Sequence, residues 1–151
     1  MRLVNYLRDS LIFLDIEAKD KEDAIAGIVN LMYESKAISD PKKFLDEVLQ
    51  RESLGSTGIG KGVALPHART QNVKEIVIAV TRLKEGIEFN SEDGQPVQLI
   101  FLLGTPLKAV GEYLKVLARL SKLLHDDKVR KSLLKAKSPI EVRKILEDAE
   151  N

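Results

Sequence analysis

An arginine and a histidine bracket a glycine-rich stretch in the first half of this 151-residue chain. Arg51 precedes the stretch, glycines occupy alternate positions 58, 60 and 62, and His67 follows directly after Pro66. A neutral imidazole can accept a phosphoryl group covalently and release it again. A guanidinium can hold two phosphate oxygens at once, and glycine-rich turns present backbone N–H groups to anions. These residue types and their spacing therefore favour phosphate chemistry centred on His67.

The residues between Arg51 and His67 supply further candidates. Glycine tolerates positive φ angles and lets another group approach the backbone closely. The Thr57 hydroxyl can bond either to a phosphate or to the second imidazole nitrogen. Lys61 and Arg69 could add positive potential, although exposed charges are usually just solvated. The residues that we expect to bind phosphate or to shape the site are Thr57, Gly58, Ile59 and Gly60.

A nucleotide-binding P-loop is the nearest competing motif, and the chain departs from it in two ways. Residues 55–61 satisfy G-x-x-x-x-G-K, but position 62 is glycine where a P-loop needs Ser or Thr to hold magnesium. A P-loop also runs from strand to helix, whereas here a helical pattern precedes the loop and a short apolar strand, 63–65, follows it. Metal binding at His67 would need several further ligands around it. We therefore expect no metal and no cofactor; the plain alternative for His67 is a histidine that caps a strand end.

Helix and strand patterns alternate along the rest of the chain. Apolar, β-branched runs predict strands at 11–16, 63–65, 76–83, 87–89 and 97–103, with Gly86 turning the chain before the fourth. Helices are predicted after the capping residues Asp20, Asp40, Asp126 and Ser138, and from about Pro106 to Leu124. A solvated acidic tail ends the chain. We predict an α/β fold: one domain over residues 1–151, with a mixed sheet of four to five strands covered by helices on both faces.

Arg51 lies in the last turn of the helix predicted after Asp40. Because it flanks the apolar stripe of that helix, its stem can lie over the core while its guanidinium reaches toward the glycine loop. It can equally complement the negative end of the helix dipole. The residue pattern alone leaves both roles open. The stripe consists of Phe44, Leu45, Val48 and Leu49.

Composition excludes several classes of protein. Lys and Arg number 24 against 23 Asp and Glu, so the net charge of +1 argues against a nucleic-acid binder that relies on a general positive field. The absence of cysteine excludes disulfides, thiolate metal sites and cysteine nucleophiles within these residues. The N-terminal residues lack the apolar core of a signal peptide, and no apolar run approaches the length of a membrane span. We expect a soluble, cytoplasmic protein.

The stretch from Glu52 to Ala68 resembles the enzyme IIA domain of the fructose/mannitol type from the bacterial phosphoenolpyruvate:sugar phosphotransferase system (PTS). Every position that the family pattern restricts is met: the acidic Glu52, then Ile59-Gly60, then the run 63–68, Val-Ala-Leu-Pro-His-Ala. Arg51 and the pair Thr57-Gly58 also match. Weaker similarity covers the whole chain, including 93–97 and 113–118.

The resemblance implies a histidine phosphocarrier in which His67 is phosphorylated, and it favours a role for Arg51 in the site. It implies a phosphohistidine on HPr as donor and a cysteine on an enzyme IIB domain as acceptor, which must lie on another polypeptide. Two roles stay open: sugar uptake, or regulation of partner proteins as in the nitrogen-related branch. A non-catalytic interaction module is a remote alternative, disfavoured by the intact Arg51 and His67. Each transfer needs a docking face, to which Leu54, Ile59 and Leu65 could contribute if they are not core.

Tyr113 is a departure from the family, which often places a second histidine at the start of the long helix. The change leaves His67 intact but weakens any mechanism that needs a pair of imidazoles. Tyr113 can donate a hydrogen bond toward the site or simply pack within the helix stripe. His125, at the other end, is explained as a cation near the last carbonyls. The predicted stripe is Val110, Tyr113, Leu114, Leu117, Leu120 and Leu124.

Overall fold

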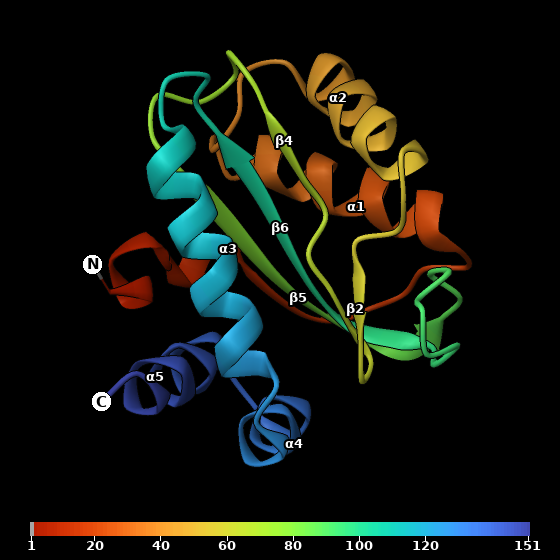
Figure 1. The fold of residues 1–151 in the computed structure, drawn as a ribbon, viewed down its shortest axis with the longest axis vertical. Helices are drawn as coiled ribbons and strands as arrows, with labels where there is room; N and C mark the ends of the chain where they lie inside the picture. The colour runs from red at the N-terminus through yellow and green to blue at the C-terminus, as the bar shows by residue number, and fades with distance from the viewer. Residues whose placement is uncertain (1) are drawn as a thin grey trace.

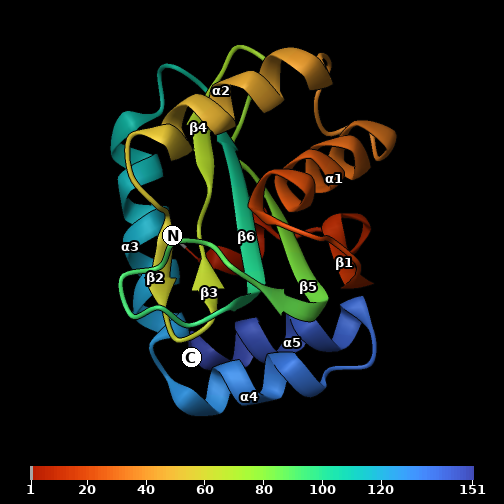
Figure 2. The same cartoon turned by 90° about the vertical axis from the view of Figure 1, so that its right-hand side faces the viewer.

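The computed structural model describes residues 2–151, which form one mixed sheet between two layers of helices (Figures 1 and 2). The strands of this part of the chain are β1 Ile12–Ile16, β2 Gly58–Gly60, β3 Val63–Ala64, β4 His67–Arg69, β5 Val77–Ile87 and β6 Val97–Thr105. Their order is β1-β5-β6-β3-β2, and β4 also pairs with β6. β5 is antiparallel to β6, whereas β3 and β4 run parallel to it. The predicted α/β fold is confirmed.

Four of the helices in the described residues begin where the capping residues predict. The helices of this part of the chain are the 3₁₀-helices η1 Leu3–Tyr6 and η2 Asp9–Leu11, and α1 Lys21–Glu34, α2 Pro41–Ser53, α3 Val110–Leu124, α4 Asp127–Lys135 and α5 Pro139–Ala149. The side chains of Asp20, Asp40, Asp126 and Ser138 each accept a hydrogen bond from a backbone N–H in the first turn. These bonds satisfy donors that a helix leaves unpaired, which explains why the starts of α1, α2, α4 and α5 could be read from sequence.

The sheet is covered on both faces, and β6 lies at its centre. Helices α1 and α2 pack on one face, and α3, α4 and α5 on the other (Figures 1 and 2). Ile100 and Leu102 of β6 belong to the core under α1 and α2, whereas Leu99, Phe101 and Leu103 belong to the core under α3 to α5. The continuous apolar run therefore fills two cores at once, as expected for a strand without a solvent face.

Helix α3 differs from the prediction in both its start and its buried face. It begins at Val110, after a turn at 107–108, and not at Pro106. Val116, Leu120 and Leu124 are fully buried, whereas Val110 and Leu114, which we placed in the stripe, are 41% and 56% exposed. Apolar residues occupy a broad arc of this helix, so periodicity could not tell its packed edge from its free edge.

The strands around the glycines also differ from the prediction. β5 continues through Gly86 to Ile87, with a shift of register after Arg82, where we expected a turn. A Cβ on Gly86 would lie 3.1 Å from Pro96 Cβ, so glycine serves close packing there. The sheet has six strands, beyond the predicted four to five, because β2 and β4 are short segments on either side of the 63–65 run.

The two ends of the chain are tied together. The carboxylate of Glu150 accepts hydrogen bonds from the backbone N–H groups of Leu3 and Val4 at 2.8 and 3.2 Å. Its side chain is only 2% exposed, so the expectation of a solvated acidic tail is wrong at this residue. Within residues 2–151, no helix is both long and apolar enough to cross a membrane.

Candidate active site

His67 is the first residue of β4, where pairing with β6 fixes its position. Leu103 of β6 lies opposite it, and the Leu103 N–H donates to the Pro66 carbonyl at 2.9 Å. His67 therefore opens a strand, whereas we expected it just past a strand end. Proline at position 66 ends β3 and lets the chain resume pairing further along the same edge of β6.

The imidazole of His67 is held in one tautomer. Its Nδ1 lies 2.8 Å from the Leu65 carbonyl oxygen. Because a carbonyl oxygen can only accept, Nδ1 carries the proton and Nε2 keeps a bare lone pair. The residue is 9% exposed, so the ring is largely enclosed. This arrangement presents one defined nucleophilic atom, Nε2.

The surroundings of His67 favour its neutral form. Burial lowers the pKa of the imidazole below its usual 6.5, and the positive charge of Arg51 lowers it further. The hydrogen bond to Leu65 and the negative charge of Glu52 raise the pKa in part. Since the net shift is downward, the ring is neutral and able to attack an electrophile near pH 7.

Arg51 lies in the last turn of α2, directly before the glycine-rich stretch. Its guanidinium donates to the Gly55 carbonyl at 2.9 Å. Its positive charge acts to lower the pKa of both His67 and Tyr113, so the guanidinium is near enough to both rings to affect their protonation. It bonds to no other described residue, and the rest of its N–H groups can serve an anion. Its role in phosphate transfer stays a prediction.

Tyr113, in the first turn of α3, packs against the imidazole. The two ring centroids are 5.4 Å apart and the planes are inclined by 50°. Burial raises the pKa of the Tyr113 hydroxyl, and the charges of Arg51 and Arg69 partly oppose that rise. The hydroxyl makes no hydrogen bond to a described residue. Tyr113 thus packs against the His67 imidazole, which favours the packing alternative, and a role for its hydroxyl in the site stays a prediction.

Thr57 is bonded to Glu52, which the sequence singled out only as a matched motif position. The Thr57 hydroxyl donates to one carboxylate oxygen of Glu52 at 2.6 Å, and the Thr57 N–H donates to the other at 2.9 Å. Lys21 of α1 completes the cluster, with Nζ 2.9 Å from the Glu52 carboxylate. Sequence reasoning missed Lys21 altogether. The available signal was an acidic residue in the last turn of a helix, where the dipole disfavours it unless it is paired.

The glycines of the stretch let it pack against the loop that joins β5 to β6. A Cβ on Gly58 would meet Ser91 Oγ at 2.1 Å, so any larger residue there would force Ser91 to shift. Gly60 has a φ of +91° and begins the turn to β3. The backbone N–H of Gly58 donates to Ser56 Oγ, and that of Lys61 donates to Asp93. These N–H groups are engaged inside the protein, which favours a shaping role for the stretch.

Exposed apolar side chains lie on the segments that carry the site. We call Leu54, Leu107, Val110 and Leu114 the apolar rim; their exposed fractions are 81%, 44%, 41% and 56%. Leu54 caps the helix that carries Arg51, and the Leu107 carbonyl accepts a hydrogen bond from Arg69 at 2.8 Å. Val110 and Leu114 flank Tyr113 on α3. Of the other candidates for a docking face, Leu65 is buried in the core and Ile59 is half-buried.

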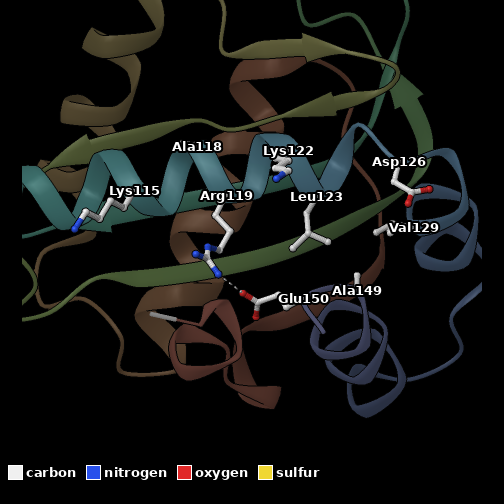
Figure 3. A pocket seen from close by; sticks show the side chains of 9 residues that line it. All are labelled: Lys115, Ala118, Arg119, Lys122, Leu123, Asp126, Val129, Ala149 and Glu150. Carbon is white, nitrogen blue, oxygen red and sulfur yellow. Dashed lines mark hydrogen bonds and ion pairs between the residues drawn. The ribbon is translucent and has the colours of Figure 1, made fainter.

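A hollow lies along α3 from Lys115 toward the C-terminal end of the helix (Figure 3). It has a volume of about 860 Å³ and lies between α3, the start of α4 and the end of α5. Lys115, Arg119 and Lys122 line it from α3. None of Arg51, Thr57, His67 and Tyr113 borders it. His125, the exposed C-cap of α3, is roughly 18 Å along the helix from Tyr113, at about 1.5 Å per residue.

Comparison with protein families matches nearly the whole chain. Residues 5–149 match the family described as phosphoenolpyruvate-dependent sugar phosphotransferase system, EIIA 2. The PTS system fructose-specific EIIA component of Haloferax volcanii is 35% identical over 136 residues, which cover 90% of this chain and 88% of that protein. The PTS system fructose-specific EIIABC component of Bacillus subtilis is 39% identical over 138 residues, covering 91% of this chain. The match spans only 22% of that longer protein.

A solved structure has the same fold over almost its full length. The crystal structure of nitrogen regulatory protein IIA-Ntr from Neisseria meningitidis matches with a TM-score of 0.89 and 38% sequence identity. The match covers 95% of this chain and 98% of that one. Relatives with sugar-related names are therefore similar to this chain in sequence, and a protein with a regulatory name is similar to it in both sequence and fold.

Proposed function

Because this chain belongs to the EIIA type-2 family of the phosphotransferase system, we propose that it is a histidine phosphocarrier whose acceptor atom is Nε2 of His67. The donor is a phosphohistidine of an HPr-like protein, and the recipient is a cysteine of an enzyme IIB partner in fructose/mannitol-type sugar uptake. The observation that carries the proposal is the bond between His67 Nδ1 and the Leu65 carbonyl at 2.8 Å, which leaves Nε2 bare.

Both transfers proceed without a general base. In the first, the Nε2 lone pair forms a new P–N bond while the P–N bond of the donor breaks, and its electron pair returns to the donor imidazole. In the second, a partner thiolate forms a P–S bond and Nε2 recovers its lone pair. The proton stays on Nδ1, hydrogen-bonded to the Leu65 carbonyl, throughout both transfers. The protein's contribution is position and charge, as is usual for phosphoryl transfer.

Arg51 serves this chemistry in two ways. Its charge helps to keep the imidazole neutral before transfer, since it contributes to the lowered pKa of His67. The same charge stabilises the phosphoryl oxygens during and after transfer, and a planar guanidinium can hold two of them. One N–H is anchored on Gly55, which limits the conformational freedom that binding would otherwise have to restrict.

The apolar rim provides a surface on which donor and recipient can dock in turn. Its four exposed side chains lie on the segments around His67, and a docking face is expected to be apolar at its centre. The 151 residues contain no cysteine, so a cysteine recipient lies outside them. Because His67 is only 9% exposed, donor and recipient must approach it through the small part of its surface that is open to solvent.

A second candidate function uses the same histidine for regulation. The similarity to the nitrogen regulatory protein of Neisseria meningitidis favours it, at 38% identity over nearly the full chain. In this role the phosphorylation state of His67 governs binding to target proteins, and no sugar is moved. The chemistry of loading is identical, so the two functions separate only at the second transfer.

Phosphorylation in a reconstituted system tests the proposal. We expect incubation with phosphoenolpyruvate, enzyme I and HPr to give an acid-labile, base-stable label on the parent protein and none on His67→Ala. His125→Gln is the matched control, because it removes the other histidine. Label that persists in His67→Ala would exclude the assignment. Adding a fructose-type IIB domain then separates the two functions: discharge to its cysteine supports uptake, whereas a loaded protein that does not discharge supports regulation.

A further inference from the structure

A chain of hydrogen bonds connects a buried carboxylate to the imidazole of His67. Glu52 binds both the N–H and the hydroxyl of Thr57, at 2.9 and 2.6 Å. The Thr57 carbonyl accepts from the Leu65 N–H at 3.0 Å, and the Leu65 carbonyl accepts from His67 Nδ1 at 2.8 Å. The carbonyl that selects the tautomer of His67 thus belongs to a residue whose own N–H is held by Thr57.

The carboxylate at the head of this chain occupies an unfavourable place. Glu52 lies near the C-terminal end of α2, where the helix dipole disfavours a negative charge, and its side chain is only 4% exposed. Lys21 offsets these costs at 2.9 Å, and its ammonium also lies over the Phe89 ring at 4.7 Å from the centroid. A buried charge with three partners on two other segments is an organised feature, not a surface ion pair.

The hydrogen bonds from Thr57 to Glu52 connect the buried carboxylate to the backbone beside His67. Thr57 is 6% exposed and begins the segment that becomes β2, so its carbonyl points across to the chain returning through β3. Without Glu52, the Thr57 N–H and hydroxyl would be buried donors without an acceptor, which is costly. The segment would then shift, and the Leu65 backbone bonded to it would shift with it.

We propose that Glu52, anchored by Lys21 and acting through Thr57, is a positioning residue that holds the Leu65 carbonyl on Nδ1 and so keeps Nε2 of His67 as the accepting atom. The proposal rests on the proposed function, since it matters for transfer only if His67 carries the phosphoryl group. Glu52 itself touches neither phosphate nor imidazole. Its contribution is to orientation, which is worth a large factor in rate when reacting atoms must be in line.

Two pairs of variants test the proposal. Glu52→Gln keeps the size of the side chain and removes its charge, and Asp46→Asn is its control: an exposed acid on the same helix. Thr57→Val keeps the shape and removes the hydroxyl, and Thr57→Ser restores the hydroxyl. The tautomer of His67 is read from the ¹⁵N chemical shifts of its two ring nitrogens in the unphosphorylated protein. If Glu52 and the Thr57 hydroxyl served only to stabilise the fold, replacing them would leave the ¹⁵N chemical shifts of His67 unchanged.

We expect the parent, Asp46→Asn and Thr57→Ser to show a protonated Nδ1 and a bare Nε2. Glu52→Gln and Thr57→Val should show a mixture of tautomers, with single-turnover transfer from phospho-HPr slowed about tenfold to a hundredfold, the usual effect of misplacing a reacting group. Folded Glu52→Gln and Thr57→Val with parental shifts and rates would overturn the proposal. If Glu52→Gln does not fold, Thr57→Val against Thr57→Ser decides alone.

The same data separate this proposal from the function beneath it. The tautomer is measured without any donor, so it reports on positioning even if the protein accepts no phosphate. A parent protein that shows the expected tautomer and its loss in Glu52→Gln, yet takes no label from HPr, would leave the positioning intact and contradict the phosphocarrier function. A parent protein that takes the label, together with an unaltered His67 tautomer in Glu52→Gln and Thr57→Val, would support the phosphocarrier function and contradict the positioning role of Glu52.

Discussion

Helix α3 borders two regions that differ in how open they are and in the bonding of their charged residues. Near its first turn, Tyr113 packs on His67, an enclosed side chain with one ring nitrogen bonded and the other bare. From Lys115 onward, Lys115, Arg119 and Lys122 line one side of an open hollow of about 860 Å³ (Figure 3). The hollow has cations but no histidine among its lining residues. The chemistry is expected where bonding leaves one ring nitrogen free, not in the open hollow.

The charges of the two regions are also used differently. In the hollow, Arg119 pairs with Glu150 at 3.5 Å, and Glu150 is itself occupied with the N-terminal backbone. Asp126 caps α4. These groups hold helices and chain ends together. At the histidine, Arg51 and Glu52 are neighbours in sequence with opposite effects on the pKa of one imidazole. The comparison therefore predicts that changing the charges of Arg51 or Glu52 alters phosphoryl transfer, whereas changing the lysines that line the hollow does not.

Substitution of Arg51 should have the largest effect short of losing His67. Charge-assisted hydrogen bonds contribute about 1.5–3 kcal/mol, so Arg51→Ala should slow single-turnover transfer from phospho-HPr roughly tenfold to more than a hundredfold. Arg51→Lys keeps the charge but not the fork and should fall between that variant and the parent. The melting temperature is measured alongside. Parental transfer combined with a melting temperature several degrees lower would make Arg51 a helix terminator and nothing more.

The protonation of His67 should also respond to Arg51. Because burial and the Arg51 charge lower the pKa of His67, an NMR titration of the parent should show a midpoint below 6.5. Arg51→Ala removes one of these causes, so its midpoint should move upward. The sign for stability follows: below pH 6.5 the unfolded chain binds this proton more readily than the folded one, which destabilises the fold as pH falls. A midpoint above 6.5 in the parent would contradict the described environment.

Tyr113 should matter for its ring more than for its hydroxyl. The ring packs on His67 at 5.4 Å between centroids, while the hydroxyl bonds to no described residue. Tyr113→Phe should therefore transfer phosphate within a few-fold of the parental rate, whereas Tyr113→Ala should be slower because the imidazole loses a packed neighbour. The rates come from the same single-turnover assay. Equal losses in Phe and Ala variants would show that the hydroxyl acts in the site, contrary to this expectation.

The smallest effect on transfer is expected from substitutions in the hollow along α3. Lys115 and Lys122 make no ion pair with any residue in the described part of the chain, and both line the hollow. The double variant Lys115→Gln, Lys122→Gln should keep both the parental transfer rate and, within a degree or two, the parental melting temperature, as is usual for exposed charges. A large loss of transfer with this variant would show that the hollow takes part in docking the donor, and would break the comparison.

Local signals explain which parts of the fold were predictable. Asp20, Asp40 and Ser138 mark helix starts because a cap bonds within its own first turn. The strand 99–103 was recognisable from its continuous apolar run. The packed face of α3 was not, since nothing within Val110 to Leu124 says that Leu114 faces solvent while Val116 faces the sheet. Which face of α3 is buried depends on contacts with strands that lie earlier in the sequence.

The candidate site likewise has some residues that the sequence predicts and others that only the folded structure identifies. His67, Arg51 and the glycines were found because they are close in sequence and belong to a specific motif. The need for glycine at position 58 depends on Ser91, and the burial of Glu52 depends on Lys21. Both partners lie about thirty residues away along the chain, and only the folded sheet brings them together. Likewise, the accepting nitrogen of His67 became definable only with the position of the Leu65 carbonyl.

The most direct test of this account is the identity of the phosphorylated atom. Protein labelled with ¹⁵N and loaded from phosphoenolpyruvate through enzyme I and HPr would be examined by NMR for coupling between phosphorus and each ring nitrogen of His67. The described geometry predicts phosphorus on Nε2, with Nδ1 still protonated and bonded to Leu65. Phosphorus on Nδ1, or on a residue other than His67, would contradict the central claim.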